Sequence, residues 1–246
     1  MGSLESWGAF LACAFAAEII GTMAGFGAAT ILTPIAALFM DIKTAIAVVA
    51  CFHLFGNASR LVFFGRHIEW KIWAEFGLIS FVCTLAGAAL TASLSSAIVK
   101  SALGIFLLLF VVMSCLPATS FRLPSTPPTL IGGGVLSGFI AGLIGTGGAI
   151  RSACLLVFGL SKEAYIGTSA AIALFVDATR LPVYVSRQFI PARLLTVVIS
   201  LVGVAFAGSW VGQRLLRHVS ATAFNRFVLV MLTVMGIKFI LDGWRG

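Results

Sequence analysis

Asn57-Ala58-Ser59-Arg60-Leu61 and Asp177-Ala178-Thr179-Arg180-Leu181 are near copies of one another, 120 residues apart in the chain. The same offset places Gly25-Phe26-Gly27-Ala28-Ala29 on Gly145-Thr146-Gly147-Gly148-Ala149. Glycine-rich breaks and arginines therefore repeat as a set, which indicates an internal duplication. In a membrane protein, two repeats with interrupted helices are typical of a transporter that binds its substrate where the repeats meet.

The composition of the chain is that of a membrane protein. Hydrophobic residues make up 60% of its 246 residues, charged residues make up 10%, and the mean hydropathy is +1.12. Soluble domains have roughly 25% charged residues. Apolar runs long enough to cross a bilayer recur from one end of the chain to the other, so we expect a single multi-pass membrane domain over residues 1–246.

The apolar runs predict an all-α fold. Residues 8–40, taken as one helix, would be about 50 Å long, which exceeds the roughly 30 Å of a hydrocarbon core. Because glycines interrupt this segment, we expect a hairpin of two partial helices with its turn at membrane depth. The complete set of predicted helices lies at about residues 5–24, 28–40, 44–64, 72–94, 98–116, 131–144, 149–160, 164–185, 194–213 and 222–242.

Each repeat is therefore predicted to contain a broken-helix hairpin and three transmembrane helices. Five elements are an odd number, so the second repeat must enter the membrane in the opposite direction from the first. We expect inverted repeats over residues 5–116 and 131–242. The connection between them, residues 117–130, is rich in proline and hydroxyl residues, a composition that does not continue a helix.

The net charge of +8 restricts the partners of the chain. Nucleic acid is excluded, because the basic residues are scattered over short loops and form no stripe with interleaved aromatic residues. Most Lys and Arg residues lie at predicted helix ends, where contact with membrane lipid accounts for them. Arg60, Arg151 and Arg180 lie in apolar surroundings and indicate a small anionic substrate. The oligomeric state is left open, and a homo-oligomer is compatible with the sequence.

Motifs of soluble enzymes are missing from the sequence. The five cysteines include no CxxC pair, and the three histidines have neither metal-ligand spacing nor a motif such as HExxH. The sequence contains no P-loop and no GxSxG motif. We therefore expect no enzyme activity, no metal site and no cofactor.

Glycines at the two predicted breaks are candidate substrate-binding residues. The half-helices after Gly27 and Gly148 begin there, so their free N–H groups and the positive ends of their dipoles point at an anion. A purely conformational role is the alternative. The candidates are Gly25, Gly27, Gly145, Gly147 and Gly148.

Arginines are the second group of candidates. Arg151 follows the second glycine run directly, where its permanent charge can bind an oxyanion through two hydrogen bonds. Arg60 and Arg180 each follow Asn57 or Asp177 by three residues, so each pair shares a helix face. Asp177 can pair with Arg180, whereas neutral Asn57 leaves the charge of Arg60 more available. The alternative for both arginines is that they extend from a helix end to the membrane interface.

Hydroxyl and titratable side chains complete the candidate site. Thr30, Thr168 and Ser169 can donate to a bound oxyanion, although such side chains in membrane helices commonly bond to backbone carbonyls. Glu18 and His53 lie deep within predicted helices. They are candidate proton carriers for coupled transport, or else partners in buried hydrogen bonds between helices.

Several sequence elements together resemble the sulfite exporter TauE/SafE family of membrane transporters over nearly the whole chain. GFGAATILTP and GTGGA open the two repeats, and NASRL and DATRL are the duplicated motif. FFGRHIEWK at 63–71 closes the third helix, and IGTSAA at 166–171 opens the helix after the second hairpin. Where the family commonly has a GxGGG run in the first hairpin, this chain has GFGAA.

The resemblance implies a secondary transporter, an exporter in a bacterial inner membrane, for a small organosulfur or sulfur oxyanion such as sulfite, sulfoacetate or thiosulfate. With the two predicted breaks, it implies an anion bound between them and released by alternating access. Two alternatives are left open: a membrane-embedded enzyme or redox subunit that acts on a sulfur compound, and an anion channel.

Overall fold

The computed structural model describes residues 4–24, 27–116, 123–215 and 221–244. Over these residues the chain forms ten α-helices, two short 3-10 helices and no strand. The first half contains α1 (Leu4–Ala24), α2 (Ala29–Phe39), α3 (Ile42–Phe64), η1 (Gly65–His67), α4 (Trp70–Ser93) and α5 (Ser96–Cys115). The second half contains α6 (Pro127–Ile144), α7 (Gly148–Leu156), α8 (Lys162–Ser186), η3 (Ala192–Leu194), α9 (Leu195–Leu215) and α10 (Ala221–Trp244).

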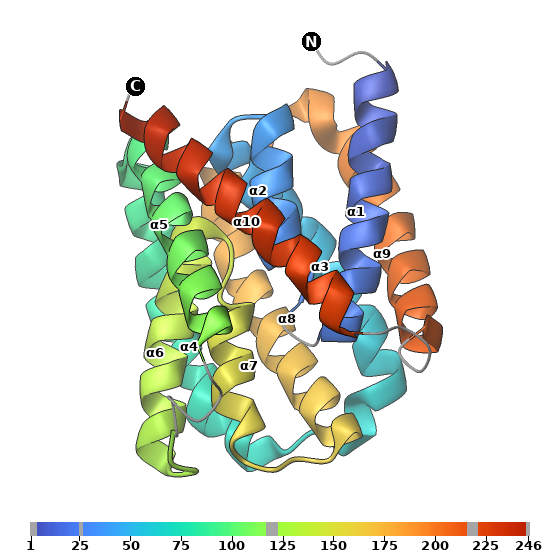
Figure 1. Ribbon diagram of the computed structural model, residues 1–246, viewed down its shortest axis with the longest axis vertical. Coiled ribbons are helices and arrows are strands. Elements are labelled where there is room, and N and C mark those ends of the chain that lie inside the picture. Colours follow the sequence, from blue (N-terminus) through green and yellow to red (C-terminus); the bar gives the residue numbers. More distant parts are fainter. Residues whose placement is uncertain (1–3, 25–26, 117–122, 216–220, 245–246) are drawn as a thin grey trace.

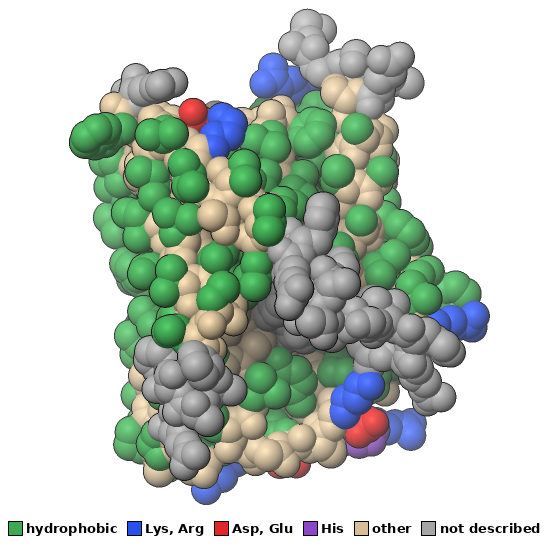
Figure 2. Space-filling model, in the orientation of Figure 1, with side chains coloured by type: hydrophobic (Ala, Val, Ile, Leu, Met, Phe, Trp, Pro, Cys, Tyr) green, Lys and Arg blue, Asp and Glu red, His purple; other side chains and the backbone are tan. Residues whose placement is uncertain are grey.

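The prediction of an all-α membrane protein is confirmed. In Figure 2, hydrophobic side chains are spread over most of the described part of the visible face, while the few Lys and Arg side chains lie near its upper end and over its lower part. A surface that crosses a bilayer has this distribution. Six helical segments among the described residues are long and apolar enough to span a membrane: Ile42–His67, Trp70–Ser93, Ser96–Cys115, Pro127–Ile144, Lys162–Ser186 and Ala192–Leu215.

Two helix boundaries differ from the prediction by about one turn. α6 begins at Pro127, inside the stretch predicted to be a connection, because Pro127 and Pro128 occupy the first helical turn. A proline there removes no hydrogen bond, since the first N–H groups of a helix are unpaired in any case. α7 ends at Leu156 and not near residue 160, because the chain turns at Gly159, which has a φ of +63°.

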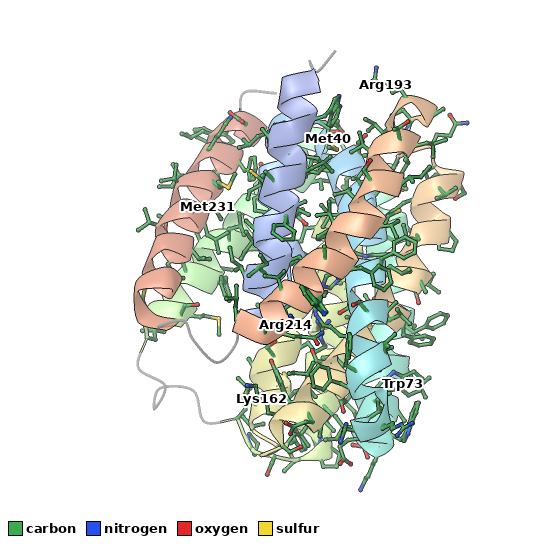
Figure 3. All side chains as sticks on the ribbon, turned by 90° about the vertical axis from the view of Figure 1, so that its right-hand side faces the viewer. Met40, Trp73, Lys162, Arg193, Arg214 and Met231 are labelled. Atoms are coloured by element: carbon green, nitrogen blue, oxygen red, sulfur yellow. The ribbon has the colours of Figure 1, made fainter. Side chains whose placement is uncertain are left out.

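The two helical hairpins begin at opposite ends of the molecule. In Figure 1, α1 begins at the upper end and α2 returns toward it, whereas α6 begins at the lower end and α7 returns toward that end. Figure 3 places Lys162, at the start of α8, and Arg193, just before α9, at opposite ends as well. The breaks of both hairpins therefore lie inside the molecule, between its two ends.

Helices α3 and α8 form the centre of the molecule and pack against each other. Residues 45–50 of α3 have no exposed surface. α1 and α9 pack together on one side of this centre, and α4 and α6 pack together on the other (Figure 1). The central pair carries the buried polar side chains His53, Asn57, Arg60, Asp177 and Arg180, so a site built from them is surrounded by protein.

Glycines bring α4 and α6 into close contact. A Cβ on Gly138 would lie 2.4 Å from the carbonyl oxygen of Ser80, and one on Gly142 would lie 2.3 Å from that of Thr84. The hydroxyls of Ser80 and Thr84 donate to the carbonyls of Gly134 and Gly138, each at 3.0 Å. This close packing holds α6, and with it the second break, in a fixed position.

Candidate functional site

Backbone conformation distinguishes the two breaks from ordinary helix ends. Gly27 has a φ of +86° and Gly145 a φ of +82°, values that favour glycine strongly over other residues. Gly145 ends α6, and its N–H donates to the carbonyl of Ala141 at 3.1 Å. Gly147 precedes α7 with a φ of −131°, and a Cβ there would lie 2.2 Å from the carbonyl oxygen of Ser137. The glycines are therefore needed for backbone conformation at two positions and for space at a third.

The two breaks meet through a pair of hydroxyl groups. Thr30 lies in the first turn of α2, and Thr146 lies between Gly145 and Gly147. Their Oγ1 atoms are 2.8 Å apart, and both side chains are buried. Segments more than a hundred residues apart in the chain thus come together at the same depth in the molecule.

A narrow cavity lies beside this contact and has polar residues from three helices in its wall. Its lining residues are Ala29, His53, Ala141, Gly145, Gly147, Gly148, Arg151, Ala173, Val176, Asp177 and Arg180. The free space is sufficient for about one water molecule in this conformation. α7 begins at the cavity wall, so the unpaired N–H groups of its first turn lie there too.

Arg180 and Asp177 form a buried ion pair on α8. Arg180 Nε and Nη2 donate to Asp177 Oδ1 at 3.0 and 2.6 Å, and Nη1 donates to the carbonyl of Ala141 at 2.8 Å. The other carboxylate oxygen of Asp177 lies 2.8 Å from His53 Nδ1 on α3. The carboxylate therefore joins the two central helices.

Arg60 occupies the equivalent position on α3 but pairs with a different helix. Its Nη2 donates to Glu18 on α1 and to Thr22 Oγ1 at 2.9 Å, and its Nη1 donates to Asn57 Oδ1 at 2.9 Å. Ser209 on α9 donates to Glu18 at 2.6 Å. The charge of Arg60 is thus compensated, which differs from the interpretation based on neutral Asn57.

Asn57 connects the two ion pairs. Its Oδ1 accepts from Arg60, and its Nδ2 donates to Asp177 Oδ2 at 3.4 Å. Because Asn57 and Asp177 are the equivalent residues of the duplicated motif, the two copies contact each other directly. The result is one continuous buried polar network that runs from α1 through α3 to α8.

Arg151 is the one buried arginine without a carboxylate partner in the part of the chain that the structure describes. Only 4% of its surface is exposed, and its Nε donates to Ser169 Oγ at 3.0 Å. A buried guanidinium that lacks a counter-ion is costly in a protein interior. The cavity thus carries an excess positive charge beside the start of α7.

The sulfite exporter TauE/SafE family model matches residues 10–239 of the chain. The chain belongs to the TauE/SafE family. No curated protein and no solved structure was found to match it. Family membership makes the chain a multi-pass membrane transporter, and it agrees with the resemblance shown by the glycine breaks and the duplicated motif.

Most of the residues predicted to form a site in this TauE/SafE protein lie in or against the cavity wall. Arg151, Asp177, Arg180 and three of the glycines line it, and Ser169 supports Arg151. Gly27 lies against the Nε2 edge of the buried His53 ring, since a Cβ there would be 2.6 Å from Nε2. Thr30 reaches Thr146 beside the cavity.

The remaining predicted residues lie elsewhere. Thr168 accepts a hydrogen bond from the backbone N–H of Glu69 at 2.9 Å, away from the cavity. Arg60, Asn57 and Glu18 belong to the part of the polar network that does not line the cavity. Gly25 lies outside the described residues.

Sequence reasoning missed three polar side chains: Thr22 and Ser209 of the polar network, and Thr146 beside the cavity. Thr22 follows Glu18 by four residues and therefore shares its helix face, which is a usable signal. Thr146 lies within the GTGGA element. Ser209 contacts Glu18 across 191 residues of sequence, and no local pattern predicts such a contact.

Proposed function

We propose that this TauE/SafE protein is a secondary transporter that exports a small sulfur oxyanion, such as sulfite, sulfoacetate or thiosulfate, across a bacterial inner membrane by alternating access. The observation that carries the proposal is Arg151, a buried cation at the wall of a central cavity that has no counter-ion among the described residues. An oxyanion bound there supplies the missing negative charge.

The surroundings of Arg151 suit an oxyanion in two further ways. The first turn of α7, a nine-residue helix that begins at Gly148, offers unpaired N–H donors and the positive end of its dipole. The side chain of Arg180 lines the same cavity, although its charge is shared with Asp177. Hydrogen bonds from charged groups and backbone amides are the usual means by which proteins hold sulfonates and sulfur oxyanions.

We further propose that the two halves are inverted repeats related by a pseudo-two-fold axis in the membrane plane. In support, α1 packs on α9 as α6 packs on α4, and α3 packs on α9 as α8 packs on α4. The equivalent helices α3 and α8 pack on each other, and so do α5 and α10. In this arrangement the cavity lies between the repeats, where a rocking motion can expose it to either side of the membrane.

The inverted arrangement can be tested by thiol labelling of two equivalent residues. Asp41 precedes α3 and Ser161 precedes α8, and both are exposed. Asp41→Cys and Ser161→Cys, each in a variant without the native cysteines, are expected to react with an impermeant reagent from opposite sides of the membrane. Labelling of both from the same side would contradict inversion.

The anion site can be tested by titrating the purified full chain with thiosulfate, sulfite and sulfoacetate, and with neutral solutes for comparison. Arg151→Gln removes the charge and keeps some hydrogen-bonding capacity. The loss of a hydrogen bond to a charged group, about 1.5–3 kcal/mol, weakens anion binding roughly tenfold to a hundredfold. Arg193→Gln, at an exposed position in η3, is the matched control and should leave the affinity unchanged. Equal affinities of the wild type and a folded Arg151→Gln variant would refute the site.

A further inference from the structure

His53 lines the cavity and has one buried ring nitrogen without a hydrogen-bond partner among the described residues. The side chain is buried, with 4% of the residue exposed, and it forms part of the cavity wall. Its Nε2 has no hydrogen-bond partner among the described residues. Gly27, which lacks a side chain and has a positive φ, lies directly over this nitrogen. A buried nitrogen without a partner at the wall of a proposed anion site indicates that the ligand itself is its partner.

Hydrogen bonding on the other side of the ring determines where the proton of neutral His53 lies. Arg60 can only donate, so the oxygen of the Asn57 amide faces it and the Nδ2 group faces Asp177 and His53. Asp177 is ion-paired with Arg180 and therefore only accepts. His53 Nδ1, 2.8 Å from Asp177 Oδ2, must donate to it. In the neutral ring, Nε2 then carries a lone pair and no proton.

A lone pair and an oxyanion repel each other at hydrogen-bond distance, because both are acceptors. A proton on Nε2 turns this repulsion into a charge-assisted hydrogen bond. The carboxylate of Asp177 on the far side of the ring stabilises the resulting imidazolium. The geometry of the ring therefore favours joint binding of an anion and a proton.

The charges around His53 determine which anions require that proton. The ion pairs of Arg60 with Glu18 and of Arg180 with Asp177 each cancel, which leaves the charge of Arg151. These side chains come from α1, α3, α7 and α8, and on α3 itself the thiol of Cys51 lies near Asp177 and Arg180. With His53 neutral, the buried network carries one positive charge, which balances a monovalent anion. A divalent anion leaves one negative charge uncompensated.

We propose that His53 is a further substrate-binding residue that takes up one proton from water when a divalent oxyanion binds, and takes up none when a monovalent anion binds. This inference rests on the anion site proposed above and deepens it. Release of the anion on the opposite side of the membrane returns the proton to water there. Divalent sulfur oxyanions are thus carried together with one proton, and monovalent sulfonates are carried alone.

The test is titration calorimetry of the purified full chain in pairs of buffers with different ionisation enthalpies, which counts the protons taken up per bound anion. The divalent probe is thiosulfate and the monovalent probe is methanesulfonate. We expect about one proton with thiosulfate and none with methanesulfonate. At pH values where one proton is taken up per bound thiosulfate, linkage makes the affinity for thiosulfate fall about tenfold per pH unit, and the affinity for methanesulfonate should stay constant.

Two variants assign the proton to His53. His53→Gln and His53→Asn both remove the titratable ring, and the asparagine keeps a donor near the position of Nδ1, so at least one of them is expected to fold. Both should bind thiosulfate at least tenfold more weakly than the wild type and without proton uptake, and the loss of affinity should be smaller for methanesulfonate than for thiosulfate. Arg193→Gln is the control.

The outcomes separate this inference from the function on which it rests. Thiosulfate binding by the wild type without proton uptake, or proton uptake that persists in a folded His53 variant, overturns the role of His53 and leaves the anion site intact. Failure of the wild type to bind either anion overturns the anion site and the role of His53 with it.

Discussion

The two copies of the duplicated motif neutralise their buried arginines with carboxylates from different places in the chain. In the second copy, Arg180 pairs with Asp177, three residues earlier on the same helix. In the first copy, position 57 is a neutral asparagine, and Arg60 pairs instead with Glu18 on α1. One ion pair is local to α8, whereas the other joins two helices that are far apart in the chain.

This difference shows how a duplicated sequence can build an asymmetric site. Because position 57 is neutral, its amide can bridge Arg60 and Asp177, and two carboxylates do not have to face each other. Asp177 is then free to accept a hydrogen bond from His53, and the second half has no histidine at the position equivalent to His53. Arg151, by contrast, belongs to the second half, and the first half has no arginine at the equivalent position. The two halves therefore supply different side chains to one cavity.

The largest effect that tests this comparison is expected for Asp177→Asn. The substitution leaves the buried Arg180 without a counter-ion and takes the acceptor from His53, and breaking one partner out of a buried pair costs about 3–5 kcal/mol. The measurement is the free energy of unfolding in mixed micelles. Asp242→Asn breaks the exposed pair with Lys238 and should cost less than about 1 kcal/mol. Equal losses in both variants would show that the Asp177 pair is not buried from solvent.

Exchanging the two equivalent residues sharpens the same test. In the double variant Asn57→Asp, Asp177→Asn, the carboxylate moves beside Arg60, and the number of buried charges is unchanged. Asn57→Asp alone places a second carboxylate about 3.4 Å from that of Asp177 and should also destabilise the protein. We expect the free energy of unfolding of the double variant to lie between that of the wild type and that of Asp177→Asn. A double variant no more stable than Asp177→Asn would show that the two positions are not interchangeable.

The helices could be predicted from sequence because their signals are local. The lengths of the apolar runs, the glycine breaks and the prolines were sufficient to predict all ten helices. The prolines gave a wrong boundary only at α6, because they occupy its first turn. The pairing of Arg180 with Asp177 could be recognised as one alternative for the same reason, since both residues lie on one helix face. Within one helix, geometry follows directly from spacing.

Contacts between helices could not be predicted in this way. Nothing local connects Glu18 with Arg60, 42 residues later, or Thr30 with Thr146, so the charge of Arg60 was interpreted as available. Thr168 shares its helix with Asp177 and lies next to Ser169, yet it faces Glu69 and not the cavity. The missing information is how each helix is rotated about its own axis, which is set by packing between helices.

The two breaks can be compared through their glycines, with an intermediate expected effect. Gly27→Ala imposes a left-handed conformation at a cost of about 1–2 kcal/mol, and its Cβ would also meet His53 Nε2 at 2.6 Å. Gly145→Ala has the same backbone cost, but the atoms nearest to its Cβ belong to the side chain of Ile46, at 3.1 Å. We therefore expect Gly27→Ala to lose more anion binding than Gly145→Ala.

Gly132→Ala is the matched control for both glycine variants. Gly132 is exposed on α6, and a Cβ there would meet nothing within 4 Å. Alanine is the better helix former by up to about 1 kcal/mol, so this variant should be as stable as the wild type or more stable. Anion affinity and the free energy of unfolding are measured for all three variants. If Gly27→Ala bound anions as well as Gly132→Ala did, the proposed difference between the two breaks would be refuted.

The smallest expected effect concerns the contact that joins the two breaks. Thr30→Val and Thr146→Val each leave the other buried hydroxyl without its partner, 2.8 Å away in the wild type, and each should cost about 1 kcal/mol of unfolding free energy. The double variant removes both hydroxyls and leaves no orphaned group, so its cost should be smaller than the sum of the single costs. A double-mutant cycle measures that difference, and a coupling of about 0.5–1.5 kcal/mol is expected for groups in direct contact. Strictly additive costs would mean that the hydroxyls do not bond to each other, and that the breaks of the two halves approach without a direct link.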